Sequence, residues 1–184
     1  YGRKYIELTA EYVKMFKEGI IPEIEPGKFA TAKRVWIRLG EKNESMGIEQ
    51  FEWEDGRTIA TEIGGKKCRK SIPAEYPGFH IYFKIDDSFL SYIDETVYIT
   101  IEYYDKGSGH FFVQYDSNDE TAILNGAYKA TKKVQRTNSN QWKKVTLEMP
   151  MARFANSQNG GADFRINSST EDMYVSEAVI HLEK

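Results

Sequence analysis

The sequence has one cysteine, Cys68, so an internal disulfide is excluded and an apolar core must hold the fold together. It also lacks any apolar run near the ~20 residues that a membrane-spanning helix needs, so no membrane span is expected. The first residues, Tyr1 to Lys4, do not resemble a signal peptide, and we expect the chain to be a piece of a longer protein.

A strongly basic charge balance is also missing. Lys and Arg number 25 against 28 Asp and Glu, which gives a formal net charge of −3. A broad electrostatic attraction to nucleic acid or to an anionic membrane is therefore not expected. With 184 residues, 40% of them hydrophobic, the chain has the length and composition of one globular domain.

Recognisable enzyme motifs are absent too. The sequence contains no G-x-S-x-G, H-E-x-x-H, Walker or G-x-G-x-x-G pattern, and its three histidines lie far apart. Aromatic residues, in contrast, are plentiful, with 12 Tyr, 10 Phe and 3 Trp. Few carriers of imidazole or thiol chemistry and many rings that can stack on a ligand favour binding over catalysis.

Short alternating runs follow one another from Arg34 onward, which is typical of an all-β antiparallel sandwich. The clearest run is 97–104, where Val, Ile, Ile and Tyr alternate with Tyr, Thr, Glu and Tyr. The glycine-containing segment 105–109 then predicts a hairpin to 110–115. The predicted strands are 34–39, 48–54, 58–63, 78–85, 97–104, 110–115, 127–136, 142–149, 162–167 and 174–182.

The first 28 residues fit neither pattern clearly. Leu8, Tyr12 and Phe16 would share a helical face, yet 5–12 also tolerates a strand. Pro22 and Pro26 would end either element. We therefore predict a lead-in or linker segment over 1–28, which packs on a β-sandwich module over 29–184.

Several short motifs give the chain a family resemblance. They are Phe51–Asp55 (FEWED), Glu62–Gly65 (EIGG), Phe79–Asp86 (FHIYFKID), Asn140–Trp142 (NQW) and the closing run Tyr174–Leu182. Together they resemble carbohydrate-binding modules of families 6 and 35, which are galactose-binding-like jelly-roll sandwiches. The motif pair YYDKG at 103–107 and GADFRI at 161–166 also resembles accessory domains of bacterial polysaccharide-degrading enzymes.

The resemblance implies a non-catalytic module that binds a polysaccharide or oligosaccharide. Such a module tethers a covalently linked glycoside hydrolase or polysaccharide lyase to its glycan, in a secreted or cell-surface bacterial protein. It also implies a structural Ca²⁺ held by Glu52 and Glu54. The family usually has an Asp beside the closing strand, and here Glu177 is the candidate substitute.

Strand parity indicates where a ligand would bind. If consecutive strands run antiparallel, the loops at 64–78, 105–109, 137–141 and 168–172 meet at one end of the sandwich, called the tip below. Rings there can stack on a sugar, and Asn, Asp and Arg can hydrogen-bond its hydroxyls. The predicted ligand-binding residues are Arg69, Tyr76, Tyr104, Asp105, His110, Asn140, Trp142, Asn167 and Asp172.

Two other functions stay open at this point. A structural sandwich could brace a neighbouring catalytic domain without binding sugar. A small jelly-roll lyase or hydrolase would need Tyr or His as a base beside an Arg that neutralises a uronate. The basic cluster Lys66, Lys67, Arg69 and Lys70 allows an acidic sugar as ligand without establishing one.

Overall fold

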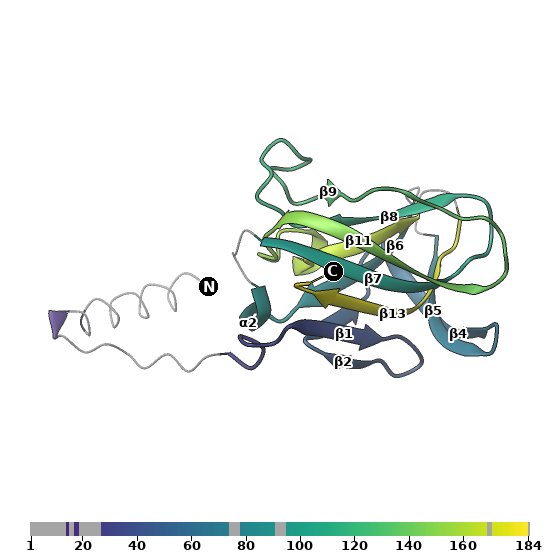
Figure 1. The fold of residues 1–184 in the computed structure, drawn as a ribbon, viewed down its shortest axis with the longest axis horizontal. Coiled ribbons are helices and arrows are strands. Elements are labelled where there is room, and N and C mark those ends of the chain that lie inside the picture. Colours follow the sequence, from purple (N-terminus) through teal and green to yellow (C-terminus); the bar gives the residue numbers. More distant parts are fainter. Residues whose placement is uncertain are drawn as a thin grey trace.

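The computed structural model describes residues 14, 17–18, 27–73, 78–90, 95–168 and 171–183. The described chain folds into two antiparallel sheets packed face to face, so the predicted all-β antiparallel sandwich is confirmed (Figure 1). Most of the predicted lead-in, 1–28, lies outside the described residues, as does Tyr76.

Sheet A has the strand order β11 (Trp142–Ala152), β7 (Glu95–Tyr104), β13 (Tyr174–His181), β1 (Arg34–Arg38) and β2 (Glu44–Met46). The hairpin of β4 (Arg57–Ile63) and β5 (Lys66–Ile72) joins it through β13. Sheet B has the order β10 (Val134–Gln135), β8 (His110–Tyr115), β12 (Phe164–Ser168), β6 (Phe79–Ile85) and β3 (Ile48–Phe51), with β9 (Lys129–Ala130) beside β8. Two short helical segments, α2 (Asp87–Leu90) and η1 (Asn159–Gly161), lie in connections.

Two sequence predictions are wrong in detail. Strand β5 lies within 64–78, which we predicted to be a loop, because only Cys68 and Ser71 of Lys66–Ile72 are buried and the alternating apolar signal is missing. The single strand predicted over 127–136 is instead two short strands, β9 and β10. Between them, the Thr131 hydroxyl accepts a hydrogen bond from the Val113 N–H, so a side chain replaces one ladder bond.

The core lies between the sheets and is built by strict alternation. Val97, Ile99, Ile101 and Tyr103 of β7 face inward, as predicted. Opposite them, sheet B contributes Ile81, Phe83 and Ile85 of β6, Phe111, Val113 and Tyr115 of β8, and Phe164 and Ile166 of β12. Phe83 and Phe164 are stacked at the centre, with ring centroids 4.6 Å apart. This burial supplies the main stabilisation, since the chain has no disulfide.

Two buried carboxylates fix the loops at the end of the sandwich opposite the tip. Asp163 accepts the backbone N–H groups of Ile85 and Asn156, and Asp116 accepts those of Ala155 and Ser157. Burial raises the pKa of Asp163 to about 6. Folding therefore favours the protonated form of Asp163. Protonated Asp163 stabilises the fold at low pH, and this contribution is lost as the pH rises from the pKa of the unfolded chain through about 6.

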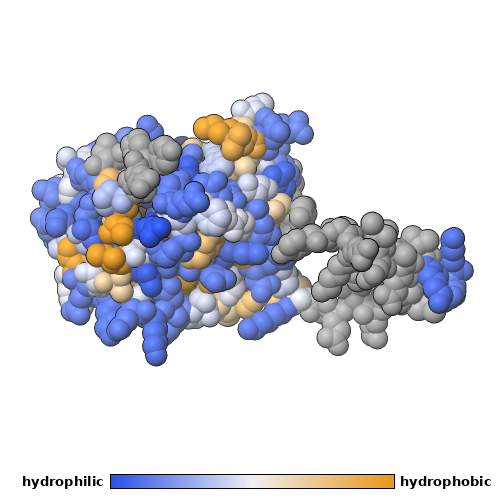
Figure 2. All heavy atoms as spheres, turned by 180° about the vertical axis from the view of Figure 1, so that it is seen from behind, coloured by the Kyte–Doolittle hydropathy of each residue, from blue (hydrophilic) through white to orange (hydrophobic). Residues whose placement is uncertain are grey.

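The surface is mostly hydrophilic, with separate apolar patches (Figure 2). Of the side chains that the structure describes, the exposed large hydrophobic ones are Trp53, Ile59, Ile123, Leu124 and Met151. Among the described residues, no helix has the length and apolar character needed to cross a membrane.

Truncation of a stacked core ring tests this packing. We expect Phe164→Ala to lower the free energy of unfolding by about 3–5 kcal/mol, because it leaves a cavity beside Phe83. Ile123→Ala, at a side chain that is 64% exposed, is the control and should change it by less than ~0.5 kcal/mol. Urea unfolding measures both values, and equal effects would contradict the assigned core.

Candidate functional site

Two loops of the predicted tip, 105–109 and 137–141, meet around a carboxylate with no solvent exposure. Asp105 accepts hydrogen bonds from the backbone N–H and hydroxyl of both Thr137 and Ser139, and from the Lys143 ammonium at 2.6 Å. Burial by itself would raise the pKa of Asp105, but the bonds from Lys143, Thr137 and Ser139 hold it well below its usual range. Both oxygens are engaged within the protein, so Asp105 organises the tip and does not face a ligand.

A second organiser of the tip is Arg136, which the sequence analysis missed. Its guanidinium, only 1% exposed, donates to the carbonyl oxygens of Lys106 and Asp172 and to the Ser168 hydroxyl. Arg136 thus ties the 105–109 loop to the two ends of the 168–173 connection. Its position in a polar run of the sequence gave no sign of burial.

The predicted stacking residue Trp142 is half-buried. Its indole N–H donates to the Ile63 carbonyl at 3.1 Å, and its ring meets that of Tyr104 edge-on at 5.4 Å between centroids. The Lys66 ammonium stands 5.2 Å from the Trp142 ring. A Cβ at Gly64 would come within 2.6 Å of the Tyr104 ring, so only glycine fits this turn. Trp142 therefore holds the β4–β5 hairpin against the start of β11.

A hollow of about 270 Å³ lies at the tip. Asp172 lines it and pairs with the Lys70 ammonium at 2.6 Å. Asn140, whose side-chain amide bonds to the Asn138 carbonyl, adopts a positive φ of 55° in the neighbouring loop. The other residues around the hollow are Lys106, Gly107, Asn138, Glu171 and Tyr174.

Of the predicted ligand residues that the structure describes, only Asp172 lines this hollow. Arg69 is engaged on the inner side of the β4–β5 hairpin, where it donates to Thr58 and Asn43 and pairs with Glu52 at 3.5 Å. His110 and Asn167 belong to strands of sheet B and face away from the core. The structure therefore divides the predicted set among three places.

The predicted calcium ligands are not brought together. Glu52 accepts the backbone N–H and the hydroxyl of Thr58, whereas Glu177 lies on β13 between Arg38 and Lys144. Glu54 is exposed in the turn that follows β3. Across the part of the chain that the structure describes, no three His, Cys, Asp or Glu side chains are grouped so that they could hold an ion.

The outer face of sheet B carries a set of polar and aromatic side chains in register. Tyr82 of β6, Arg165 of β12 and Gln114 of β8 form one row, since Arg165 is the strand partner of both. His80, Asn167 and Phe112 form the next row in the same way. We call these six residues the sheet B face. None of them belongs to the core cluster, so each points away from the core, although Tyr82, His80 and Gln114 are buried.

Hydrogen bonds link most of the sheet B face. Arg165 donates to the Tyr82 hydroxyl at 2.6 Å and to the Gln114 carbonyl oxygen at 2.8 Å, and Asn167 donates to the same Gln114 oxygen at 3.2 Å. The Tyr82 hydroxyl in turn donates to Asp55 at 3.0 Å. The Arg165 guanidinium also lies over the Tyr82 ring. The network fixes the donors and acceptors of this face before any ligand arrives.

Two buried polar atoms of the sheet B face lack a partner. Within the described residues, neither His80 Nδ1 nor Asn167 Oδ1 has a hydrogen bond. Buried polar groups nearly always have one, and a ligand hydroxyl can supply it. Burial and the nearby Arg165 charge lower the pKa of His80 to about 4, against the opposing effect of Asp55. His80 is therefore neutral at pH 7 and can both donate and accept.

Aromatic rings flank the polar network on both sides. His110 stacks on Phe112, with centroids 6.2 Å apart, and both side chains are half-buried. On the β3 side, Phe51 lies beside Tyr82, and Trp53 is 39% exposed. The sequence analysis found His110 and Asn167 here but missed the others. The signal was available, because alternate positions of FHIYFKI, HFFVQY and FRINS place these residues opposite the core.

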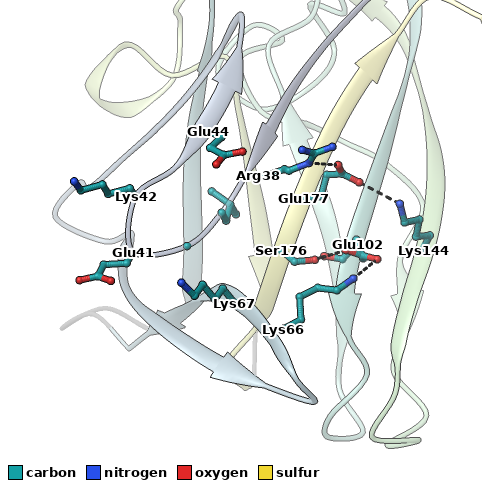
Figure 3. A pocket seen from close by; sticks show the side chains of 12 residues that line it. Arg38, Glu41, Lys42, Glu44, Lys66, Lys67, Glu102, Lys144, Ser176 and Glu177 are labelled. Carbon is teal, nitrogen blue, oxygen red and sulfur yellow. Dashed lines mark hydrogen bonds and ion pairs between the residues drawn. The ribbon is translucent and has the colours of Figure 1, made fainter.

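The outer face of sheet A holds a groove of about 650 Å³ (Figure 3). The β1–β2 hairpin forms one wall, and Lys66 and Lys67 of the β4–β5 hairpin form another. Glu102 of β7, with Ser176 and Glu177 of β13, lies between them. We call this site the sheet A groove; its further lining residues are Arg38, Leu39, Gly40, Glu41, Lys42, Glu44 and Lys144.

The fold and these sites define an antiparallel β-sandwich with two separate polar faces. No family model and no curated protein matches the sequence. Similar solved structures include the xylan-binding domain CBM22-1 of Paenibacillus barcinonensis (13% identity, 88% of this chain and 98% of that one, TM-score 0.46). Another is the third cleaved adhesin domain of Lys-gingipain from Porphyromonas gingivalis (12%, 80% and 96%, 0.45).

A carbohydrate-binding module from Cellvibrio mixtus lichenase 5A, solved with cellotriose, is also similar (13% identity, 76% of this chain and 100% of that one, TM-score 0.39). At such low identities, these neighbours do not identify the ligand of this chain. Its function has to be argued from its own residues.

The role assigned to Asp105 is testable by pH. Asp105→Asn should lower the free energy of unfolding at pH 7 by roughly 1–3 kcal/mol, because several loop donors lose their acceptor. Because the pKa of Asp105 is lowered in the folded protein, the ionised carboxylate stabilises the fold above the unfolded-state pKa of about 3.9. This contribution is lost as the pH falls below that value. The difference between wild type and variant should therefore shrink from about pH 5 to about pH 2.

Urea unfolding across this pH range measures the effect. Asp172→Asn is the matched control, since its carboxylate is 37% exposed and should contribute about 0–1 kcal/mol. Equal losses for the two variants at pH 7 would contradict an organising role for Asp105.

Proposed function

We propose that this chain is a non-catalytic carbohydrate-binding module and that the sheet B face is its ligand site. The observation that carries the proposal is the linked network of Arg165, Tyr82, Gln114 and Asn167 on the outer face of sheet B. Tyr82 and Gln114 are buried, so the network holds the partly exposed side chains of Arg165 and Asn167 in fixed positions. Its fixed donors and acceptors match the alternating hydroxyls of a sugar ring.

The flanking rings fit the other half of a sugar. A pyranose has an apolar C–H face, and Phe112 with His110 offers a half-buried aromatic surface beside the network. Trp53 offers a second such surface beyond Phe51. Aromatic surfaces at both sides of the network suit an extended glycan chain, so a polysaccharide or oligosaccharide is the proposed partner.

Catalysis is less well supported. Tyr82 and Arg165 are in contact and His80 is nearby, which is the combination that a β-eliminating lyase would require. However, Tyr82 has no solvent exposure, and burial raises its pKa above its ordinary value. A phenol of this kind remains protonated at neutral pH and is a poor base. We accordingly place this module beside a separate catalytic domain, in a secreted or cell-surface bacterial protein.

Variants of the sheet B face test the proposal. We expect Phe112→Ala and Asn167→Ala each to weaken glycan binding about tenfold or more, a loss of about 1.4 kcal/mol. Affinity electrophoresis on neutral and acidic polysaccharides finds the ligand, and calorimetry with an oligosaccharide gives the affinity. Glu148→Gln, on the outer face of sheet A, is the control and should bind like wild type.

The same experiment separates the rivals. If Trp142→Ala removes binding while the sheet B variants bind normally, the ligand site is at the tip. If nothing on the panel binds, the chain is a bracing sandwich. Unsaturated product absorbing in the ultraviolet would instead establish a lyase. The calcium ion remains a proposal, and loss of binding or of thermal stability in EDTA would support it.

A further inference from the structure

The sheet A groove is the largest hollow described above, and the proposed glycan site does not use it. Its volume of about 650 Å³ is within the ordinary range of small-molecule sites. It lies on the outer face of the other sheet, so a ligand there would be bound independently of the sheet B face.

The floor of the groove holds two carboxylates that face each other on neighbouring strands. Glu102 of β7 and Glu177 of β13 are direct strand partners. Like charges placed directly opposite in a sheet are destabilising. Here the arrangement is compensated, since Lys66 pairs with Glu102 at 2.8 Å, while Lys144 and Arg38 pair with Glu177 at 3.1 and 3.4 Å.

The carboxylates are shielded and the cations are open. The side chains of Glu102 and Glu177 are only 15% and 20% exposed, whereas those of Lys66, Arg38 and Lys144 are 42%, 63% and 57% exposed. Burial opposes ionisation of Glu102, but bonds from Lys66 and Ser176 lower its pKa below the ordinary value. Glu102 therefore stays charged. Both floor carboxylates hold their cations through the ion pairs drawn in Figure 3.

Two further lysines add to this layer. Lys42 and Lys67 line the groove, and neither takes part in an ion pair among the described residues. The carboxylates of Glu41 and Glu44 are on the wall formed by the β1–β2 hairpin, on the side away from Lys144. The groove is therefore lined by five cationic residues and four acidic ones, so the cations outnumber the carboxylates by one. The cations are Arg38, Lys42, Lys66, Lys67 and Lys144, and the acidic residues are Glu41, Glu44, Glu102 and Glu177.

We propose that the sheet A groove is a second binding site, specific for an anionic saccharide unit that carries a carboxylate or a sulfate. The anionic charge follows from the cations of the groove, and the choice of a saccharide rests on the proposed function. Lys and Arg donate charge-assisted hydrogen bonds to the anion. The wall carboxylates of Glu41 and Glu44 can accept hydrogen bonds from the neighbouring hydroxyls of the sugar.

Paired ligands and paired variants test this site. An oligogalacturonate should bind at least about tenfold more tightly than its carboxyl-reduced, uncharged counterpart, which corresponds to about 1.4 kcal/mol. The double variant Lys66→Gln/Lys144→Gln should lose that preference. Lys132→Gln/Lys133→Gln removes the same charge from exposed positions outside the groove and should keep it. Measuring the affinity of a sulfated oligogalactose in the same way, and comparing it with that of the oligogalacturonate, shows whether the groove prefers a sulfate or a carboxylate.

Amide chemical shifts locate the ligand independently of the variants. With oligogalacturonate, shifts at Glu102 and Ser176 support the groove, and shifts confined to His80 and Asn167 overturn it. If Lys66→Gln/Lys144→Gln and Lys132→Gln/Lys133→Gln weaken binding equally, the anion is attracted by net charge alone, and the proposed groove site is also overturned. If neutral glycans bind the sheet B face without any preference for charge, this inference fails and the proposed function stands. If no glycan binds, both fail.

Discussion

The interior between the two sheets accepts only apolar side chains, and this requirement determines the position of everything else. Each strand that places Ile, Phe or Val in the core must turn its intervening residues outward. In sheet B, the core positions Ile81, Phe83 and Ile166 thereby set the direction of His80, Tyr82 and Arg165. A shift of one residue in any of these strands would bury the polar network and expose the core. The sheet B face and the core are therefore specified together.

Buried carboxylates take the role that disulfides or long helices have in other small domains. Asp105, Asp116 and Asp163 each follow or precede a strand and accept backbone N–H groups from a neighbouring loop. These bonds satisfy donors that a sheet ladder cannot reach, so the loops hold defined shapes. They also differ in electrostatics, because salt-bridged Asp105 favours the ionised form while burial of Asp163 favours the protonated one. Asp105, a predicted ligand residue, thus serves the fold instead.

Much of the architecture could be predicted, because alternation is a local signal. The strands at 97–104 and 110–115 follow directly from their apolar periodicity. Strand β5 could not be predicted, since its pairing with β4 and β13 depends on partners rather than on its own apolar pattern. The candidate site was predicted only in part. His110 and Asn167 lie on or beside the sheet B face, whereas Trp142 and Asp105 hold the tip together.

The sequence by itself determined the class of fold, the inward and outward residues of each long strand, and the lack of known catalytic motifs. These properties depend on neighbours along the chain. Only the tertiary structure decided that Arg165, Tyr82 and Gln114 form one row and that Glu102 faces Glu177. Those contacts join residues that are far apart in sequence, and strand order and register set them. Sequence periodicity contains no information about which strands become neighbours, so both polar faces became visible only in the folded sandwich.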